Sequence, residues 1–206
     1  EVHAAAWKKL FDGFLEERSA QTGEPFEPFD LDADYRRHVD GKPRYEGVAA
    51  FLASRGITLP DGAPQDRPGS QSVRALGERK DEYFLEHLKQ RGVEPYDTSV
   101  ALVRKLRAQE VRTAVVSSSN NCAAVLEAAG IATLFDVRVD GTDLARFDLR
   151  GKPAPDAFLE AARRLGVDPA RAAVVEDAVA GVEAGRAGGF GCVIGVDRSG
   201  HALALR

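Results

Sequence analysis

A change of pattern near residue 94 constrains the fold of this chain more than any other feature. Before that point, apolar residues recur with the 3.6-residue period of amphipathic helices, as they do at Trp7, Leu10, Phe11, Phe14 and Leu15. After it, helical stretches alternate with four short runs rich in β-branched residues, at 113–116, 136–139, 172–175 and 192–196. Such alternation predicts right-handed βαβ units in a parallel sheet flanked by helices. We therefore expect a helical domain over residues 1–94 and an α/β domain over residues 95–206.

Apolar periodicity and helix-breaking residues define the expected helices. In the first domain they lie at about Val2–Arg18, near Asp34–Val39, around Val48–Leu52 with an end at Gly56, and from Val73 to Gly92. In the second domain, Asn121–Ala129 is expected to form the helix that follows the first strand.

The composition limits the classes of protein to which this chain belongs. With 206 residues, of which 44% are hydrophobic, it is long enough to bury a substantial core. The formal net charge is -4 and the basic residues are scattered, so we expect no nucleic acid partner. No apolar stretch approaches the roughly 18 residues that span a bilayer, so we expect no membrane partner. These features favour a soluble monomer that acts on a small molecule, with the cytoplasm as the default compartment.

Cysteine and methionine usage adds two expectations. Cys122 and Cys192 lack the C-x-x-C spacing of metal sites, and we expect both to be small, buried, apolar side chains. The chain contains no Met, so residue 1 is not expected to be the start of translation.

A hydroxyl cluster follows the first expected strand. Ser117, Ser118, Ser119 and Asn120 come directly after Val115-Val116 and before the next helix. Free N–H groups and a helix dipole at such a junction favour a bound phosphate. The alternative is an ordinary helix N-cap, which Ser and Asn also favour. The cluster alone does not decide between these two interpretations.

Two further segments carry charged side chains at turns. Lys152 lies between Gly151 and Pro153, and its flexible side chain can neutralise a phosphoryl group; the alternative is a lysine in a surface turn. Glu176 and Asp177 follow the third strand, and two adjacent carboxylates repel unless a cation lies between them. Hard oxygen ligands favour Mg²⁺, whereas the alternative is that Asp177 only caps the next helix.

Ser117, Lys152 and Glu176-Asp177, in this order and spacing, resemble motifs two, three and four of the haloacid dehalogenase superfamily. The likeness is greatest to its β-phosphoglucomutase and sugar-phosphatase subgroup and extends over nearly the whole chain. It implies a haloacid-dehalogenase-like Rossmannoid core with a parallel sheet and a helical cap. It further implies catalytic roles for Ser117 and Lys152, Mg²⁺ held by Glu176 and Asp177, and substrate contacts from Arg44, Lys80, Ser118, Ser119, Asn120 and His3.

The resemblance also implies a separate role for each of the substrate-binding residues of the cap. Arg44 is similar to a cap arginine that binds the distal phosphate of the substrate, and Lys80 is similar to a cap lysine that faces the sugar. His3 belongs to the segment from Glu1 to Lys8, which resembles the lead-in to the cap.

In this superfamily the nucleophile is a carboxylate in a D-x-D-G motif after a buried strand, and it forms an aspartyl-phosphate. Family order places that motif, with its acid/base Asp, upstream of residue 1. Asp30-Leu31-Asp32 contains the D-x-D spacing, but Pro25 and Pro28 rule out a central strand before it. We therefore expect a β-phosphoglucomutase-like phosphotransferase. The alternatives are a sugar-phosphate phosphatase and a catalytically silent sugar-phosphate-binding domain.

Overall fold

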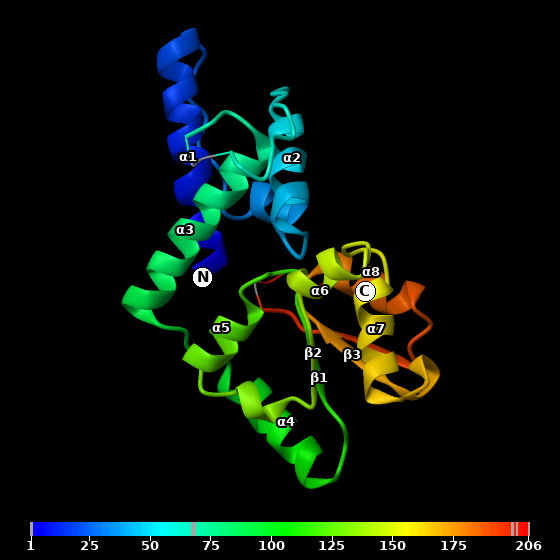
Figure 1. The fold of residues 1–206 in the computed structure, drawn as a ribbon. Coiled ribbons are helices and arrows are strands. Elements are labelled where there is room, and N and C mark those ends of the chain that lie inside the picture. The colour runs from blue at the N-terminus through cyan, green and yellow to red at the C-terminus, as the bar shows by residue number, and fades with distance from the viewer. Residues whose placement is uncertain (1, 67–68, 199, 201, 206) are drawn as a thin grey trace. The chain divides into compact units, whose positions relative to one another are not determined.

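The computed structural model describes residues 2–66, 69–198, 200 and 202–205, and it divides into two compact units (Figure 1). One unit comprises the chain up to Asp40 together with Arg44–Val93, and the other comprises Gly41–Pro43 together with the chain from Glu94 onward. Glu1, the first residue of the segment that resembles a cap lead-in, lies outside the described residues. Gly41–Pro43 thus belongs to the α/β unit, although it lies between helices of the first unit in the sequence.

The regular elements described in the first unit are all helices, joined by irregular segments. Its elements are α1 (Val2–Thr22), the short π-helix η1 (Tyr35–Val39), α2 (Arg44–Ser54) and α3 (Val73–Arg91). Ser72 caps the start of α3 by accepting a hydrogen bond from the Ala75 N–H, and Gly92 ends it with a φ of 67°. The helices therefore follow the predicted positions, although α1 continues to Thr22.

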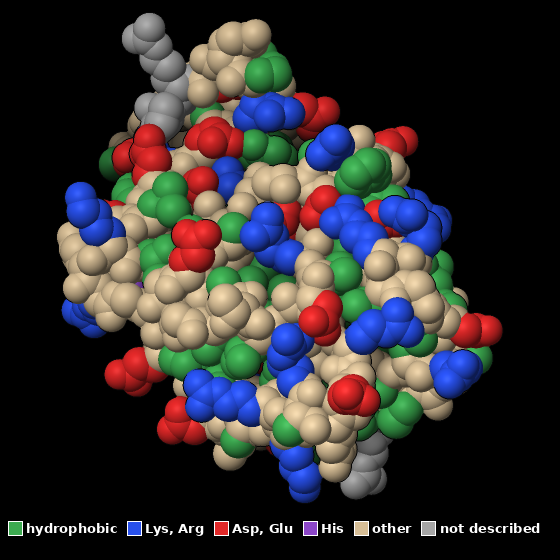
Figure 2. Space-filling view, turned by 60° about the horizontal axis from the view of Figure 1, so that its bottom comes forward, with side chains coloured by type: hydrophobic (Ala, Val, Ile, Leu, Met, Phe, Trp, Pro, Cys, Tyr) green, Lys and Arg blue, Asp and Glu red, His purple; other side chains and the backbone are tan. Residues whose placement is uncertain are grey.

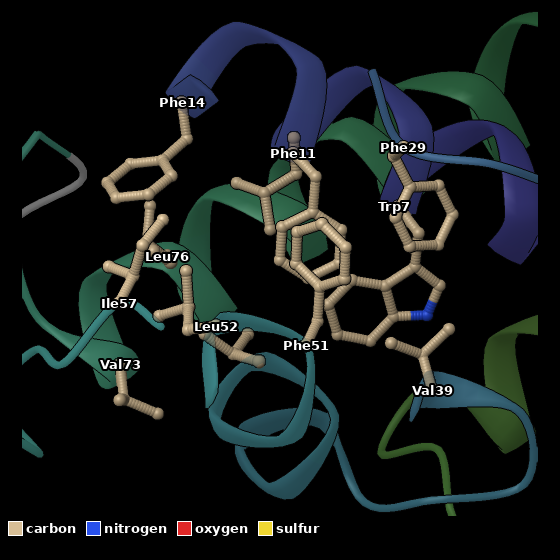
Figure 3. Close-up of a cluster of buried hydrophobic side chains, with 12 residues drawn as sticks. Trp7, Phe11, Phe14, Phe29, Val39, Phe51, Leu52, Ile57, Val73 and Leu76 are labelled. Atoms are coloured by element: carbon tan, nitrogen blue, oxygen red, sulfur yellow. The ribbon is translucent and has the colours of Figure 1, made fainter. Parts of the chain in front are cut away.

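An aromatic cluster holds the helical unit together (Figure 3). Phe11 and Phe51 are fully buried, and their ring centroids lie 4.0 Å apart. Trp7 stacks on Phe11, and Phe29 packs on both phenylalanines from the segment after α1. Burial of each such ring contributes roughly 1.5–3 kcal/mol to folding. The apolar stripe predicted on the first helix is thus the centre of this core.

The second unit alternates helices and strands. Its elements are α4 (Asp97–Ala108), β1 (Ala114–Val116), α5 (Cys122–Ala128), η2 (Ala132–Leu134), β2 (Val137–Val139), α6 (Gly141–Arg146), α7 (Asp156–Leu165), η3 (Pro169–Arg171), β3 (Ala173–Glu176), α8 (Val179–Ala187) and β4 (Cys192–Gly195). The four strands coincide with the four β-branched runs of the sequence.

The strands form two parallel pairs within the described residues. β1 pairs with β2, with Val115 opposite Arg138, and β3 pairs with β4, with Val175 opposite Ile194. Helix α7 packs against both strand pairs, because Ala157 and Ala161 contact β2 while Phe158 contacts β3. Val116 contributes to both clusters. The predicted parallel α/β architecture is confirmed.

The structure corrects one expectation about the cysteines. Cys122 is buried, as expected, but Cys192 is exposed at the start of β4. Its register partner is Ala173, which is also exposed, so Cys192 lies on the uncovered face of this strand pair.

None of the described helices combines the length and the apolar character that crossing a membrane requires. Acidic and basic side chains are interspersed on the face shown in Figure 2.

Candidate functional site

The segment after β1 forms a tight hydroxyl loop. The Ser117 N–H donates to the Val139 carbonyl at 3.0 Å, which ties the loop to the end of β2. The hydroxyls of Ser117 and Ser119 accept hydrogen bonds from the N–H groups of Ser119 and Asn121, each at 3.1 Å. Asn121 precedes α5 but makes no capping hydrogen bond with its side chain. The hydroxyls therefore order the loop itself and do not act as a simple N-cap.

Gly141 packs directly against this loop from the β2–α6 corner. Its N–H donates to the Ser119 carbonyl at 3.2 Å. A Cβ atom at position 141 would lie 2.2 Å from Asn120 Oδ1 and 2.8 Å from the Ser118 carbonyl. Only glycine fits there without displacing the loop.

Lys152 and Glu176 form a buried ion pair. Lys152 Nζ contacts Glu176 Oε1, and the side chains are only 7% and 9% exposed. Glu176 Oε2 accepts from the N–H groups of Asp177 and Ala178, each at 3.2 Å. A Cβ atom on Gly181 would lie 2.2 Å from the Glu176 carboxyl carbon, so the glycine provides the space for this carboxylate. The Glu176 carboxylate is thus paired with the Lys152 ammonium at one oxygen and hydrogen-bonded at the other, as burial of a charge requires.

Asp177 differs from its neighbour in exposure. Its side chain is 56% exposed, and Oδ2 lies 3.9 Å from Arg198 Nε. The described residues contain no group of three His, Cys, Asp or Glu side chains arranged to hold a metal ion. Since Glu176 is engaged by Lys152 and two N–H groups, Asp177 is the carboxylate of the pair that is accessible to an ion. The assignment of Glu176 and Asp177 as metal ligands stays a prediction.

Gly41 connects the hydroxyl loop with the acidic segment. The Ser118 hydroxyl donates to the Gly41 carbonyl at 2.8 Å, while a Cβ on Gly41 would lie 3.2 Å from the Cβ of Ala178. Gly41 adopts a φ of 70°, which favours glycine. The glycine turn was a visible signal, but its spatial neighbours were not.

A second group of predicted site residues lies in the helical unit. Lys80 Nζ lies 2.8 Å from His3 Nδ1, and it lies over the rings of Trp7 and Phe84 at 5.1 and 4.9 Å from their centroids. Lys80 is 4% exposed. Burial, with a smaller contribution from the charge of Arg44, lowers the pKa of Lys80 to about 7.

The His3 ring complements this buried amine. It stacks on Phe84 with centroids 4.3 Å apart. Burial, followed by the charge of Lys80, lowers the pKa of His3 to about 3, so the ring is neutral at pH 7. A neutral ring accepts a hydrogen bond from the Lys80 ammonium.

Comparison with known proteins decides the family. A family model described as haloacid dehalogenase-like hydrolase matches residues 1–189. The chain belongs to the haloacid dehalogenase-like hydrolase family. It is 47% identical over 201 residues to the β-phosphoglucomutase of Mycobacterium bovis, and the match covers 98% of this chain and 77% of that protein. The predicted family is therefore confirmed.

Two further comparisons bear on fold and activity. The chain is 40% identical over 116 residues to the trehalose-phosphate phosphatase of Mycobacterium leprae, covering 54% of this chain and 25% of that protein. The crystal structure of β-phosphoglucomutase from Clostridium difficile has a TM-score of 0.69 at 22% identity, covering 94% of this chain and 76% of that one. This haloacid dehalogenase-like chain is thus a β-phosphoglucomutase-like enzyme, a phosphotransferase or phosphatase.

Proposed function

We propose that this chain transfers a phosphoryl group between positions of a sugar phosphate, as a β-phosphoglucomutase does. The proposal rests chiefly on one observation: the Gly41 carbonyl accepts from the Ser118 hydroxyl, and a Cβ atom on Gly41 would lie 3.2 Å from the Cβ of Ala178, so the segments after β1 and β3 lie beside the same glycine. In this arrangement the hydroxyl loop, the buried Lys152 and the accessible carboxylate of Asp177 all act on one phosphate group. The 47% identity to a β-phosphoglucomutase supports the choice of substrate.

In this proposal, the hydroxyl loop and Lys152 bind the oxygens of the transferring phosphoryl group. Ser117 and Ser119, with Ser118 and Asn120 beside them, supply hydrogen-bonding groups, and Lys152 supplies positive charge close to phosphorus. Glu176 acts through Lys152, because its carboxylate fixes the ammonium and is itself fixed by two N–H groups. Ser117 and Lys152 are therefore the proposed catalytic residues, and Glu176 positions Lys152.

The donor chemistry of Asp177 fits Mg²⁺. This ion binds through one or two carboxylates and keeps several water ligands, so one exposed carboxylate at the end of β3 is compatible with it. When bound there, the ion would neutralise developing negative charge on the phosphoryl oxygens. Asp177 is accordingly the proposed protein ligand, with Glu176 as a second candidate.

The proposed nucleophile is the carboxylate of the D-x-D-G motif that is expected ahead of residue 1. One of its oxygens bonds to phosphorus while the bond from phosphorus to the sugar oxygen breaks, and the second Asp protonates that leaving oxygen. Transfer back to another sugar hydroxyl completes a mutase cycle. Asp30 is no substitute, because its Oδ1 accepts from the N–H groups of Asp32 and Ala33 in an irregular exposed turn.

Arg44, Lys80 and His3 are proposed to orient the sugar and its distal phosphate from the helical unit. A mutase must bind its bisphosphate intermediate in two orientations, which requires a second anion-binding group such as Arg44. A phosphatase has no such need. The likeness to a trehalose-phosphate phosphatase nevertheless makes phosphate release the principal alternative.

Phosphorus NMR of the full-length protein, with Mg²⁺ and β-glucose 1-phosphate, tests the proposal. We expect conversion to glucose 6-phosphate without build-up of inorganic phosphate. At a temperature at which circular dichroism shows the variant to be folded, Lys152→Ala is expected to lower the rate by about 10²- to 10³-fold, as does loss of one charge-stabilising group in other enzymes. Lys105→Ala, an exposed lysine in the same unit, serves as the matched control. Release of inorganic phosphate alone would establish a phosphatase, and no turnover would favour the silent binding domain.

A further inference from the structure

Two carboxylates of α3 hold Arg44 at the start of α2. Arg44 Nη1 lies 3.2 Å from Glu78 Oε1, and Nη2 lies 2.8 Å from Asp81 Oδ1. The arginine side chain is only 13% exposed, against 40% for Glu78 and 19% for Asp81. Glu78 and Asp81 are three residues apart and so lie on one face of the helix. The cation that is proposed to bind the distal phosphate is therefore already paired with two anions.

The neighbouring residues keep this arrangement in place. The Tyr45 hydroxyl donates to the same Glu78 oxygen that pairs with Arg44. Gly77 allows the close approach, because a Cβ atom there would lie 2.6 Å from Tyr45 Cδ1 and 3.2 Å from Arg44 Cδ. The guanidinium of Arg74 lies over the Tyr45 ring at 4.8 Å from its centroid. Arg44 is thus fixed by packing as well as by charge.

We propose that Glu78 and Asp81 are positioning residues that orient Arg44 and limit its affinity for the distal phosphate. The inference rests on the proposed role of Arg44. A guanidinium has five N–H donors, so two carboxylates can orient it and still leave donors for a phosphate. Their two negative charges, however, repel a phosphate dianion that approaches the same group. Arg44 therefore orients the distal phosphate but attracts it only weakly.

Weak distal binding suits a mutase. The bisphosphate intermediate must leave its first orientation before it binds in the second, so tight binding of the distal phosphate would slow the exchange. Glu78 and Asp81 would thereby favour reorientation over retention. Glu78 and Asp81 therefore favour a ligand whose second anionic group is released and bound again in every turnover.

Calorimetric titration of full-length protein with glucose 1,6-bisphosphate, without added metal so that turnover is prevented, measures this effect. Glu78→Gln and Asp81→Asn keep the shape and an oxygen that accepts from Arg44 but remove the charge. Each is expected to tighten binding by about 3- to 10-fold, from Coulomb's law at roughly 6 Å in water with salt screening. Glu82→Gln removes the same charge from an exposed position of α3 and is expected to change the affinity less than twofold.

Arg44→Ala separates this inference from the function on which it rests. We expect it to weaken bisphosphate binding and to abolish the gain from Glu78→Gln in the double variant, a result that loss of helix stability would not produce. If Arg44→Ala weakens binding but Glu78→Gln and Asp81→Asn do not tighten it, the role given to the two carboxylates is wrong and that of Arg44 stands. If Arg44→Ala leaves binding unchanged, the role of Arg44 is itself wrong.

Discussion

Removing either partner of the Lys152–Glu176 pair should destabilise the α/β unit strongly. Lys152→Met leaves the Glu176 carboxylate buried with only two N–H partners, and Glu176→Gln leaves the Lys152 ammonium without a counter-charge. Both side chains are less than 10% exposed, so water cannot replace the lost partner. The Phe158 ring, 5.1 Å from Lys152 Nζ, offers only weak compensation to the cation.

The magnitude follows from the cost of an unpaired buried charge. Each single variant is expected to lose about 3–5 kcal/mol of unfolding free energy. The double variant removes both charges at once and should lose only about 1–2 kcal/mol, because pairs of neutral residues replace buried ion pairs at little cost. For a chain of this size, 1 kcal/mol shifts the melting temperature by about 2–4 °C. The single variants should therefore melt roughly 6–20 °C lower than the parent.

Urea unfolding followed by circular dichroism provides the free energies. Because the chain has two compact units, hydrogen exchange of peptides from β3 and α8 should be measured alongside, with peptides from α1 as the internal control. We expect faster exchange in β3 and α8 for the single variants and near-parental exchange for the double variant. Single losses below about 1 kcal/mol, or a double loss equal to the sum of the singles, would refute the buried pair.

Three other perturbations probe separate parts of the molecule. Gly141→Ala forces its Cβ against Asn120 and the Ser118 carbonyl; we expect about 1–3 kcal/mol of destabilisation and a lower kcat in steady-state assays, and parental kcat would contradict the packing. Lys80 has a folded pKa near 7 and an unfolded value near 10.5, so the folded state binds fewer protons between these values and stability should rise with pH there, by up to about 1.4 kcal/mol per unit. Lys80→Met should remove that rise in urea titrations from pH 7 to 10; an unchanged slope would show that Lys80 is not its source. Phe11→Ala should cost about 3–5 kcal/mol and expose Trp7, measured by a red shift of tryptophan fluorescence, whereas a loss below 1 kcal/mol would contradict its central place in the core.

The sequence was most informative where local patterns determine structure. The stripe of Trp7, Phe11 and Phe14 predicted the buried face of α1 because helical periodicity places these residues on one side. Runs of β-branched residues likewise predicted the strands, and the boundaries differ by one residue at most. Family likeness, also read from the sequence, then predicted the fold and enzyme class that the comparisons confirm.

Contacts between residues that are distant along the chain could not be predicted from the sequence. Nothing local indicates that the Gly41 carbonyl accepts from Ser118, because the two are 77 positions apart. The engagement of Glu176 by Lys152 was also missed, since adjacent carboxylates alone suggested a shared cation. Burial of Lys80 between aromatic rings required the packing of α1 on α3. In each case the fold brings together groups that sequence spacing separates.

A crystal structure of the full-length protein grown with phosphate and Mg²⁺ would test the proposed phosphate site most directly. We predict a phosphate whose oxygens contact the Ser117 hydroxyl and Lys152 Nζ, with Mg²⁺ on Asp177 and the Glu176 carboxylate still against Lys152. A phosphate bound away from both Ser117 and Lys152, with no ion at Asp177, would contradict a single phosphate-transfer site built from these three segments.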